Sequence, residues 1–373
     1  MLGYFDYAAT TPVDPAVAEL VYHCMTEDFG NPSSLHHADG KAASRWISLA
    51  SEQVARLINA TPESIVYTSG ATEANNLAIF GAADFYQRRG RHLVCAATEH
   101  ASVITPMQQL QRKGYQLTLL KPDSDGIIDP DALSAVVRKD TLLVSIQHAN
   151  NETGVLQNIA KLADRVHQQN ALFHVDAAQS IGKIGVDVEA MNCDLLSLSG
   201  HKIYGPMGIG ALYVRRKPRV QLTPQLFGGG QQGSLRPGTL PTQQIAGLGK
   251  ACEIAAEKLA EEQKHLWQLH HQLLTGLNDY QINGHPTSRL PGIVNISHRH
   301  TAQDLLTSLA DFSLANGSAC NASQPGPSHV LLAMGLDRNQ AANALRISFG
   351  RFTSTQEMSS LANALGRITQ ISH

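Results

Sequence analysis

Short apolar runs alternate with amphipathic stretches between about residues 45 and 215 of the chain. Continuous apolar runs of strand length are typical of strands that are buried on both faces, as in a mainly parallel sheet. These runs cover residues 64–68, 91–96, 141–146, 171–176, 194–198 and 210–214. Helical patterns such as 131–138 and 158–169 lie between them. The alternation predicts a doubly wound α/β core.

The pattern changes near residue 250. Residues 243–277 form one long helical pattern that is rich in Ala, Leu and Glu. A strand pattern at 293–296 and further helical patterns follow it. We therefore expect a second unit at the C-terminal end, which the long helix links to the sheet.

Polar side chains able to do chemistry follow five of the predicted strands. They lie in the segments Ser69-Gly70-Ala71-Thr72-Glu73, Thr98-Glu99-His100, 147–152, 176–179 and Ser199-Gly200-His201-Lys202. Ligands of open α/β sheets bind beyond the carboxyl ends of the strands. The five segments are therefore expected to meet in one site.

Each of these residues alone also has an ordinary structural explanation. Asp176 alone is typical of a helix N-cap, His100 of a satisfied histidine at a domain edge, and Lys202 of a solvated surface lysine. Residues 69–72 alone suit a tight turn, and they form neither a Walker A motif nor a GxGxxG motif. Only the joint pattern favours a functional interpretation.

Read jointly, the segments have the groups that a pyridoxal phosphate site needs. Small residues at a helix N-terminus present backbone N–H groups to a phosphate, and Ser199 and His201 can add donors. A lysine such as Lys202 can form a Schiff base when its site lowers its pKa. A carboxylate such as Asp176 can keep a pyridinium nitrogen protonated, which makes the ring an electron sink.

Composition excludes several other classes of protein. The chain has 373 residues, 43% of them hydrophobic and 16% charged, and a net charge of -2, so no overall charge recruits nucleic acid or an anionic membrane. No apolar run approaches the ~20 residues that span a bilayer, and residues 1–6 lack the features of a signal peptide. We expect a cytoplasmic enzyme that binds neither membranes nor nucleic acid directly.

The five cysteines are scattered and include no CxxC pair, which predicts a reducing compartment, no disulfide framework and no metal site. Cys24, Cys95, Cys193 and Cys252 lie in apolar or helical contexts, where a packing role is expected. Cys320 instead lies in a loop without apolar periodicity. An exposed thiol there is reactive, so we expect Cys320 to be a nucleophile.

At these residues the chain resembles the cysteine desulfurases of the NifS/IscS type, within the class V aminotransferase-like superfamily of fold-type I pyridoxal phosphate enzymes. The resemblance extends nearly end to end. It is carried by DYAATTP (6–12), FGNPSS (29–34), TSGATE (68–73), TEH (98–100), NNETG (150–154), HVDAAQS (174–180), SGHKIYGP (199–206), GGGQ (228–231), GTLP (238–241), GSAC (317–320) and RISFGR (346–351). The SGHKIYGP and GSAC segments are the most specific.

The resemblance implies an α/β fold with two domains. The larger, residues 12–258, would have a mainly parallel seven-stranded sheet between helices and would bind the cofactor. The smaller α+β domain, residues 1–11 and 259–373, would carry the catalytic cysteine loop at about 315–328.

The resemblance also implies the reaction. Lys202 would form the Schiff base with pyridoxal 5'-phosphate and later shuttle protons, while His100 would stack on the ring and assist acid–base steps. Cys320 would take the sulfur of L-cysteine as a persulfide and leave L-alanine. An acceptor protein would then collect the sulfur for iron–sulfur cluster assembly or another sulfur-transfer pathway.

The remaining implied contacts are with the cofactor and the substrate. Asp176 would pair with the pyridine nitrogen, Asn151 and Gln179 would bond the phenolic oxygen, and Ala71, Thr72, Ser199 and His201 would hold the phosphate. Thr239 would reach the phosphate of a neighbouring subunit, which implies a homodimer. Arg346, with Asn151, would bind the substrate, its guanidinium clamping the carboxylate.

Two alternatives stay open at this point. One is a different reaction on the same cofactor, either by a selenocysteine lyase or by another class V enzyme such as an aminotransferase, which needs no loop thiol. The other is a non-catalytic partner-binding protein, which would be expected to lose Lys202 or Asp176. The flanks of Cys320, Asn316 and Asn321, differ from the common family pattern, so the sulfur acceptor is left open.

Overall fold

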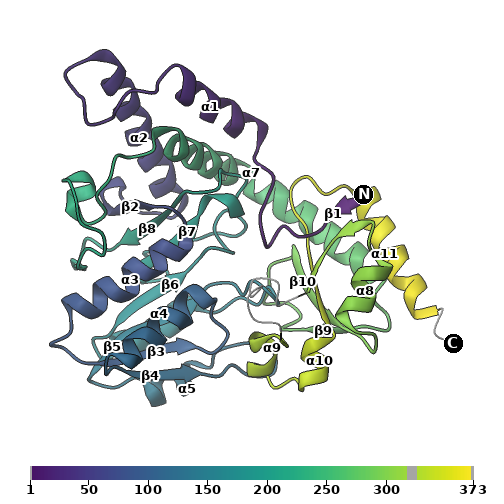
Figure 1. The fold of residues 1–373 in the computed structure, drawn as a ribbon. Coiled ribbons are helices and arrows are strands. Elements are labelled where there is room, and N and C mark those ends of the chain that lie inside the picture. The colour runs from purple at the N-terminus through teal and green to yellow at the C-terminus, as the bar shows by residue number, and fades with distance from the viewer. Residues whose placement is uncertain (1, 317–325, 371–373) are drawn as a thin grey trace.

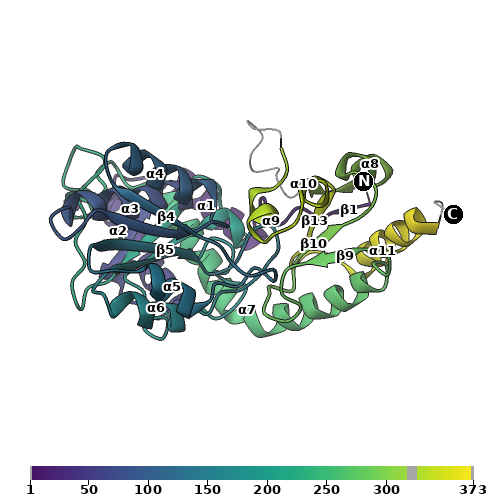
Figure 2. The same cartoon turned by 90° about the horizontal axis from the view of Figure 1, so that it is seen from below.

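The computed structural model describes residues 2–316 and 326–370, with 369–370 described by backbone alone. A larger part built on one wide sheet lies beside a smaller part, and both chain ends lie at the smaller part (Figure 1). The helix α7 (Thr242–Leu274) extends from one part into the other, as Figure 2 shows. The long helix predicted from the sequence is therefore confirmed.

The larger part contains a seven-stranded sheet within the described residues. Its strands are β2 (Ile65–Thr68), β3 (His92–Ala96), β4 (Gln116–Leu120), β5 (Thr141–Gln147), β6 (Leu172–Asp176), β7 (Leu195–Ser199) and β8 (Gly210–Val214). The order is β2-β8-β7-β6-β5-β3-β4, with β8 antiparallel to both neighbours and the other pairs parallel. The prediction of a mainly parallel sheet between helices is confirmed.

Helices cover both faces of this sheet, which explains why its central strands are apolar at successive positions. The helices are α1 (Pro15–Thr26), α2 (Ala38–Leu57), α3 (Ala71–Phe85), α4 (Ala101–Arg112), α5 (Pro130–Val136) and α6 (Ile159–His167). Phe173 and Val175 of β6 pack in one core with residues of α1, α2, α5, α6 and α7, whereas Leu172 packs in a second core with α3 and α4. Figure 2 shows α3 and α4 on the side of the sheet opposite α5 and α6.

The edge strand β4 was not predicted. Its residues, Gln116–Leu120, are mostly exposed or half-buried, so they lack the fully apolar run that identifies the central strands. An edge strand with one neighbour and one solvent-facing side does not need that composition.

The smaller part contains a four-stranded antiparallel sheet in the order β12-β13-β10-β9. Its elements are β9 (Gln281–Asn283), β10 (Ile293–Ser297), β12 (Ala315–Asn316), β13 (Ala344–Ser348), α8 (Ala302–Ser308), α9 (His329–Ala333), α10 (Arg338–Ala342) and α11 (Thr355–Gln370). The N-terminal strand β1 (Gly3–Tyr4) pairs in parallel with β11 (Phe312–Ser313). The domain boundary expected at residue 258 falls inside α7, so the division into domains stays a prediction.

The core of the smaller part explains how α7 is held there. Leu266 and Leu269 of α7 pack with Val294 of β10 and Leu361 of α11 in one apolar cluster. Within the described ranges, no helix combines the length and the apolar character needed to cross a membrane.

The start of β8 limits the residue that can stand at position 210. A Cβ built on Gly210 would lie 2.5 Å from the carbonyl oxygen of Leu198 and 2.7 Å from the Cα of Gly70. We expect Gly210→Ala to lower the free energy of unfolding by about 1–3 kcal/mol, because backbone must move to admit the methyl group. Urea denaturation measures this. The control is Gly185→Ala, where a Cβ meets nothing within 4 Å, and equal stability of the two variants would contradict the prediction.

Candidate active site

A cavity of about 540 Å³ lies at the carboxyl ends of β3, β5, β6 and β7. Its wall includes every predicted cofactor residue except Thr239: Ala71, Thr72, His100, Asn151, Asp176, Gln179, Ser199, His201 and Lys202. Thr239 is exposed and does not line the cavity of its own chain. The structure thus brings together strand ends that are far apart in the sequence, as expected for an open parallel sheet.

The N-terminus of α3 forms one side of the cavity. Gly70, the N-cap, has a φ of 152°, and no side chain caps this helix end among the described residues. A Cβ built on Gly70 would meet only Ser199 Oγ, at 3.8 Å. The backbone N–H groups of the first turn therefore face open space, which suits a phosphate.

A half-buried ion pair adjoins this turn. Glu73 accepts hydrogen bonds from the backbone N–H of Ser69 (2.6 Å) and from Arg236 Nε (2.7 Å). Burial favours the neutral acid, but the Arg236 and Ser69 hydrogen bonds outweigh it and lower the pKa of Glu73. The negative charge of Glu73 is thus neutralised before an anion reaches the turn.

Lys202 follows β7 through a single 3-10 turn, Gly200–Lys202. Its Nζ donates hydrogen bonds to the carbonyl oxygens of Ala8 (2.5 Å) and Ala9 (2.6 Å). No role was predicted for the segment 8–10 from the sequence, although this segment belongs to the DYAATTP motif that carries the resemblance. Only the tertiary structure shows that the N-terminal segment returns to the carboxyl ends of the strands and contacts Lys202 there.

His201 beside it is held in the neutral form. Burial, followed by the positive charges of Lys202 and Lys183, lowers the pKa of His201 to about 4. Its Nδ1 lies 3.2 Å from Thr10 Oγ1. At neutral pH His201 therefore contributes a hydrogen-bonding ring and no additional charge.

Asp176 ends β6, with a side chain that is held at both carboxylate oxygens. Oδ1 accepts from the backbone N–H of Ala178 (2.9 Å), and Oδ2 accepts from Asn75 Nδ2 (2.8 Å). Asn75 is fully buried in α3 and was missed by the sequence analysis. Its spacing of three residues from Thr72, which places both on one side of the helix, was the available signal.

His100 is the N-cap of α4. Its Nδ1 accepts the backbone N–H of Ser102 at 3.1 Å and lies 2.8 Å from Ser102 Oγ. The preceding residue, Glu99, is fully buried, and burial raises the pKa of its carboxyl well above the usual range. Glu99 Oε1 accepts the backbone N–H of Gln147 at 2.7 Å, which ties β3 to β5 beneath the cavity.

Arg346 of β13 is completely buried and does not line the cavity. It donates to the carbonyl oxygen of Asn151 (3.0 Å) and to Asp6 Oδ1 (2.8 Å), while its Nε has no hydrogen-bond partner within the described residues. Arg346, the predicted substrate-binding arginine, thus lies outside the cavity wall and contacts Asn151, which is part of that wall.

A second lysine, which is half-buried, lies next to the site. Lys183 Nζ donates to Gln179 Oε1 at 3.1 Å. Burial, followed by the charges of Lys202 and Arg346, lowers the pKa of Lys183 to about 7. Its charge therefore responds to any anion that binds nearby.

Cys320 lies outside the described residues, but the segments on both sides of its loop are described. Ala315 of β12 pairs with Arg346 of β13. Beyond the loop, Ser328 Oγ donates to Glu152 Oε2 (2.5 Å), and His329 Nε2 lies 3.0 Å from the carbonyl oxygen of Glu99. Both ends of the loop are thus attached to residues that border the cavity.

The other four cysteines are buried, which confirms the packing role predicted for them. Burial raises the pKa of the Cys24 thiol to about 11 and that of Cys193 to about 12. It raises the pKa of Cys95 and Cys252 as well. These thiols are therefore poor nucleophiles near neutral pH.

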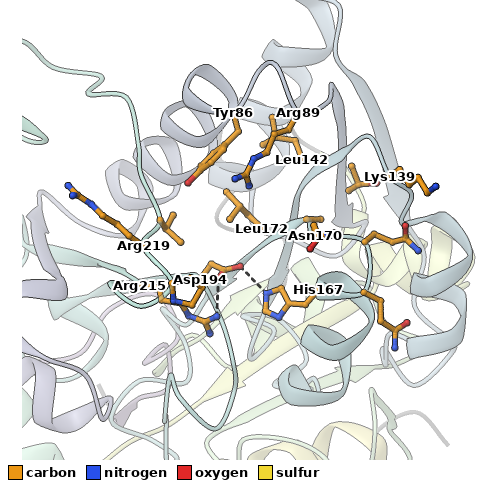
Figure 3. A pocket seen from close by; sticks show the side chains of 16 residues that line it. Tyr86, Arg89, Lys139, Leu142, His167, Asn170, Leu172, Asp194, Arg215 and Arg219 are labelled. Atoms are coloured by element: carbon orange, nitrogen blue, oxygen red, sulfur yellow. Dashed lines mark hydrogen bonds and ion pairs between the residues drawn. The ribbon is translucent and has the colours of Figure 1, made fainter.

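A larger cavity, about 840 Å³, lies at the amino ends of the strands, opposite the first cavity (Figure 3). Thr141 and Leu172, which begin β5 and β6, are part of its wall. Its one acidic side chain, Asp194, is paired with Arg215 (3.1 Å) and His167 (3.0 Å). This cavity contains none of the predicted site residues, and its ion pairs tie neighbouring strands and loops together.

Comparison with known proteins agrees with this geometry. The family model for class V aminotransferases matches residues 3–361. Cysteine desulfurase IscS of Colwellia psychrerythraea (strain 34H) is 47% identical over 361 residues, which cover 95% of this chain and 89% of the relative. The solved structure of a NifS-like protein superposes with a TM-score of 0.92 at 34% identity and covers all of both chains. A structure described as SspA in complex with cysteine gives 0.84 at 37% identity, covering 94% of this chain and 99% of the other.

Sheet order, site position and these similarities define a fold-type I enzyme of the kind that uses pyridoxal phosphate. The chain belongs to the class V aminotransferase family and, within it, to the cysteine desulfurases of the NifS/IscS type. The residues present fit that cofactor: an uncapped helix N-terminus faces open space, and a lysine and a doubly held carboxylate share its cavity.

Several histidines that are buried or half-buried predict how stability depends on pH. Burial lowers the pKa of His148, His174 and His201 from 6.5 to about 4. Between these values the unfolded chain takes up protons that the native protein does not, so stability is lost as the pH falls below about 6.5. We expect urea denaturation to show a loss between about pH 7.5 and pH 5 that is smaller in His174→Gln by on the order of 1–3 kcal/mol. The exposed control His36→Gln should keep the wild-type loss, and an unchanged loss in His174→Gln would contradict the assignment.

Proposed function

We propose that this chain is a pyridoxal phosphate-dependent cysteine desulfurase that converts L-cysteine to L-alanine and leaves the sulfur as a persulfide on Cys320. The observation that carries the proposal is the content of one cavity. Lys202, Asp176 and the uncapped N-terminus of α3 share it, and the ends of the Cys320 loop are fastened to residues at its border. The presence of both Lys202 and Asp176 argues against a protein that kept the fold only to bind a partner.

Bound pyridoxal phosphate would supply an electron-poor ring that accepts electron density from the substrate Cα. The first turn of α3, with Thr72, Ser199 and His201, would hold the phosphate. Asp176 would keep the pyridine nitrogen protonated, while Asn151 and Gln179 would bond the phenolic oxygen. His100 would stack on the ring and assist acid–base steps.

Lys202 would remove and return protons at the substrate carbon, because it is the amine within the cavity. Arg346 would attract the substrate carboxylate, and its buried Nε, which has no described partner, supports that role.

The sulfur step would belong to Cys320. Its thiolate would attack Sγ of L-cysteine, so that an S–S bond forms and the Cβ–Sγ bond breaks. The electron pair of the broken bond would end in a new C–H bond of L-alanine, with the proton supplied by a site acid. An acceptor protein would then remove the terminal sulfur, for iron–sulfur cluster assembly or another sulfur-transfer pathway.

We further propose that the working unit is a homodimer in a reducing cytoplasm. Thr239 lies outside the cavity of its own chain, and the preceding segment exposes Leu226 and Phe227, the latter 87% exposed. An exposed apolar pair beside a family phosphate residue is what a neighbouring subunit would cover. The reducing cytoplasm is proposed because the Cys320 thiol must stay reduced to react.

Substitution of the two reactive groups tests the reaction. We expect Cys320→Ser and Lys202→Ala each to abolish alanine release from L-cysteine in the presence of a reductant, because each removes a bond-forming atom. Cys24→Ala is the matched control, since its thiol is buried, and it should retain activity. Equal alanine release by wild type and Cys320→Ser would refute the role of Cys320. Relative rates on L-cysteine and L-selenocysteine would separate a desulfurase from a selenocysteine lyase.

Mixing two inactive variants tests the dimer. Lys202→Ala lacks the amine, and Thr239→Asp places a negative charge where a phosphate is expected. If Thr239 serves the neighbouring subunit, each mixed dimer has one intact site, and equal mixing should restore about a quarter of the wild-type activity. Subunits must be exchanged by mild denaturation and refolding, with each variant refolded alone as the control. Absence of recovery in dimers shown to be mixed would mean that Thr239 acts within its own chain or not at all.

A further inference from the structure

A chain of hydrogen bonds joins Asp176 on β6 to His100 at the start of α4. Asn75 of α3 is its centre, because Nδ2 donates to Asp176 Oδ2 and to Ser102 Oγ, each at 2.8 Å. Ser102 Oγ in turn lies 2.8 Å from His100 Nδ1. Three elements that are separate in the sequence therefore meet at one buried amide.

The direction of each hydrogen bond follows from the donors available. A carboxylate only accepts, so the group of Asn75 that faces Asp176 must be the NH₂. The same NH₂ donates to Ser102 Oγ, which leaves the hydroxyl hydrogen of Ser102 for His100 Nδ1. The backbone N–H of Ser102 also donates to this Nδ1, at 3.1 Å. Because two donors face Nδ1, the hydrogen of a neutral His100 ring is on Nε2.

We infer that Asn75 and Ser102 are positioning residues that hold His100 as the Nε2–H tautomer while they keep Asp176 in place. The inference rests on the proposed function, in which His100 and Asp176 contact the cofactor. A neutral His100 held in this way presents a hydrogen-bond donor, and no lone pair, at Nε2.

The burial of Asn75 argues that this amide is more than a packing group. Asn75 is fully buried, and its Oδ1 has no hydrogen-bond partner within the described residues. An apolar residue would avoid the cost of that unpaired oxygen. The two hydrogen bonds made by Nδ2 are what the polar side chain adds, and both lead to residues that line the cavity.

Two substitutions distinguish the His100 end of this hydrogen-bond chain from its Asp176 end. Ser102→Ala removes the hydroxyl, and with it one hydrogen bond each of His100 and Asn75, but it leaves the backbone N–H of Ser102 and the bond from Asn75 to Asp176. Asn75→Ala also removes the donor to Asp176. Ser102→Thr restores a hydroxyl, and Asn76→Ala is the matched control in α3, because Asn76 is half-buried and, within the described residues, its amide donates to the carbonyl oxygen of Thr72 and not to Asp176 or Ser102.

The tautomer can be read in the holoenzyme without substrate. Histidine labelled with nitrogen-15 gives different solid-state NMR shifts for protonated and unprotonated ring nitrogens, and comparison with His100→Gln assigns the signal. At about pH 8 we expect Nε2–H in the wild type and in Ser102→Thr, and added Nδ1–H in Ser102→Ala and in Asn75→Ala. An Nδ1–H ring in the wild type, or an unchanged spectrum in Ser102→Ala, would overturn the inference.

Cofactor affinity and turnover give the second readout. Ser102→Ala should lower kcat about tenfold and leave the affinity for pyridoxal phosphate within about twofold, whereas Asn75→Ala should weaken that affinity about tenfold as well. An Asn76→Ala variant as impaired as Asn75→Ala would show damage to α3 and overturn the role of the amide. Failure of the wild type to release alanine would refute the desulfurase proposal, and the NMR spectra would still decide this inference.

Discussion

A buried carboxylate at the end of β6 is the constraint around which the site is built. A charge removed from water is tolerated only when hydrogen bonds satisfy it, and Asp176 is satisfied by the N–H of Ala178 and the amide of Asn75. The first of these comes from its own turn, while the second requires α3 to lie across the end of the strand. Holding Asp176 therefore fixes the position of α3, whose first turn forms another wall of the same cavity.

Three cations lie close to one another near this site, and one of them, Arg346, is paired with Asp6. Lys202 reaches the carbonyl oxygens of the N-terminal segment, Lys183 has a pKa lowered to about 7, and Arg346 keeps a buried Nε without a described partner. Positive charges this close raise each other's energy and attract anions. A phosphate together with an amino-acid carboxylate would balance them, which is the charge pattern that the proposed cofactor and substrate bring.

The two parts of the molecule contact each other beside the cavity. The larger part supplies Lys202 and the first turn of α3, which line the cavity, and the smaller part supplies Arg346, which donates to the carbonyl oxygen of Asn151. On one side of the Cys320 loop Ala315 pairs with Arg346, and on the other side Ser328 and His329 contact Glu152 and the backbone of Glu99.

The sequence by itself determined the central strands and the residues at their carboxyl ends. Strands covered by helices on both faces are apolar at most positions, which makes them visible as short runs, and parallel strands bring their carboxyl ends together. The sequence did not reveal β4, whose exposed residues carry no such pattern, nor the contact of Ala8 and Ala9 with Lys202. The roles of Asn75 and Ser102 also became visible only in the tertiary structure. Their function depends on where α3 and α4 cross the end of β6. The spacing of Asn75 from Thr72 indicates a shared side of α3, but it does not show which strand end that side meets.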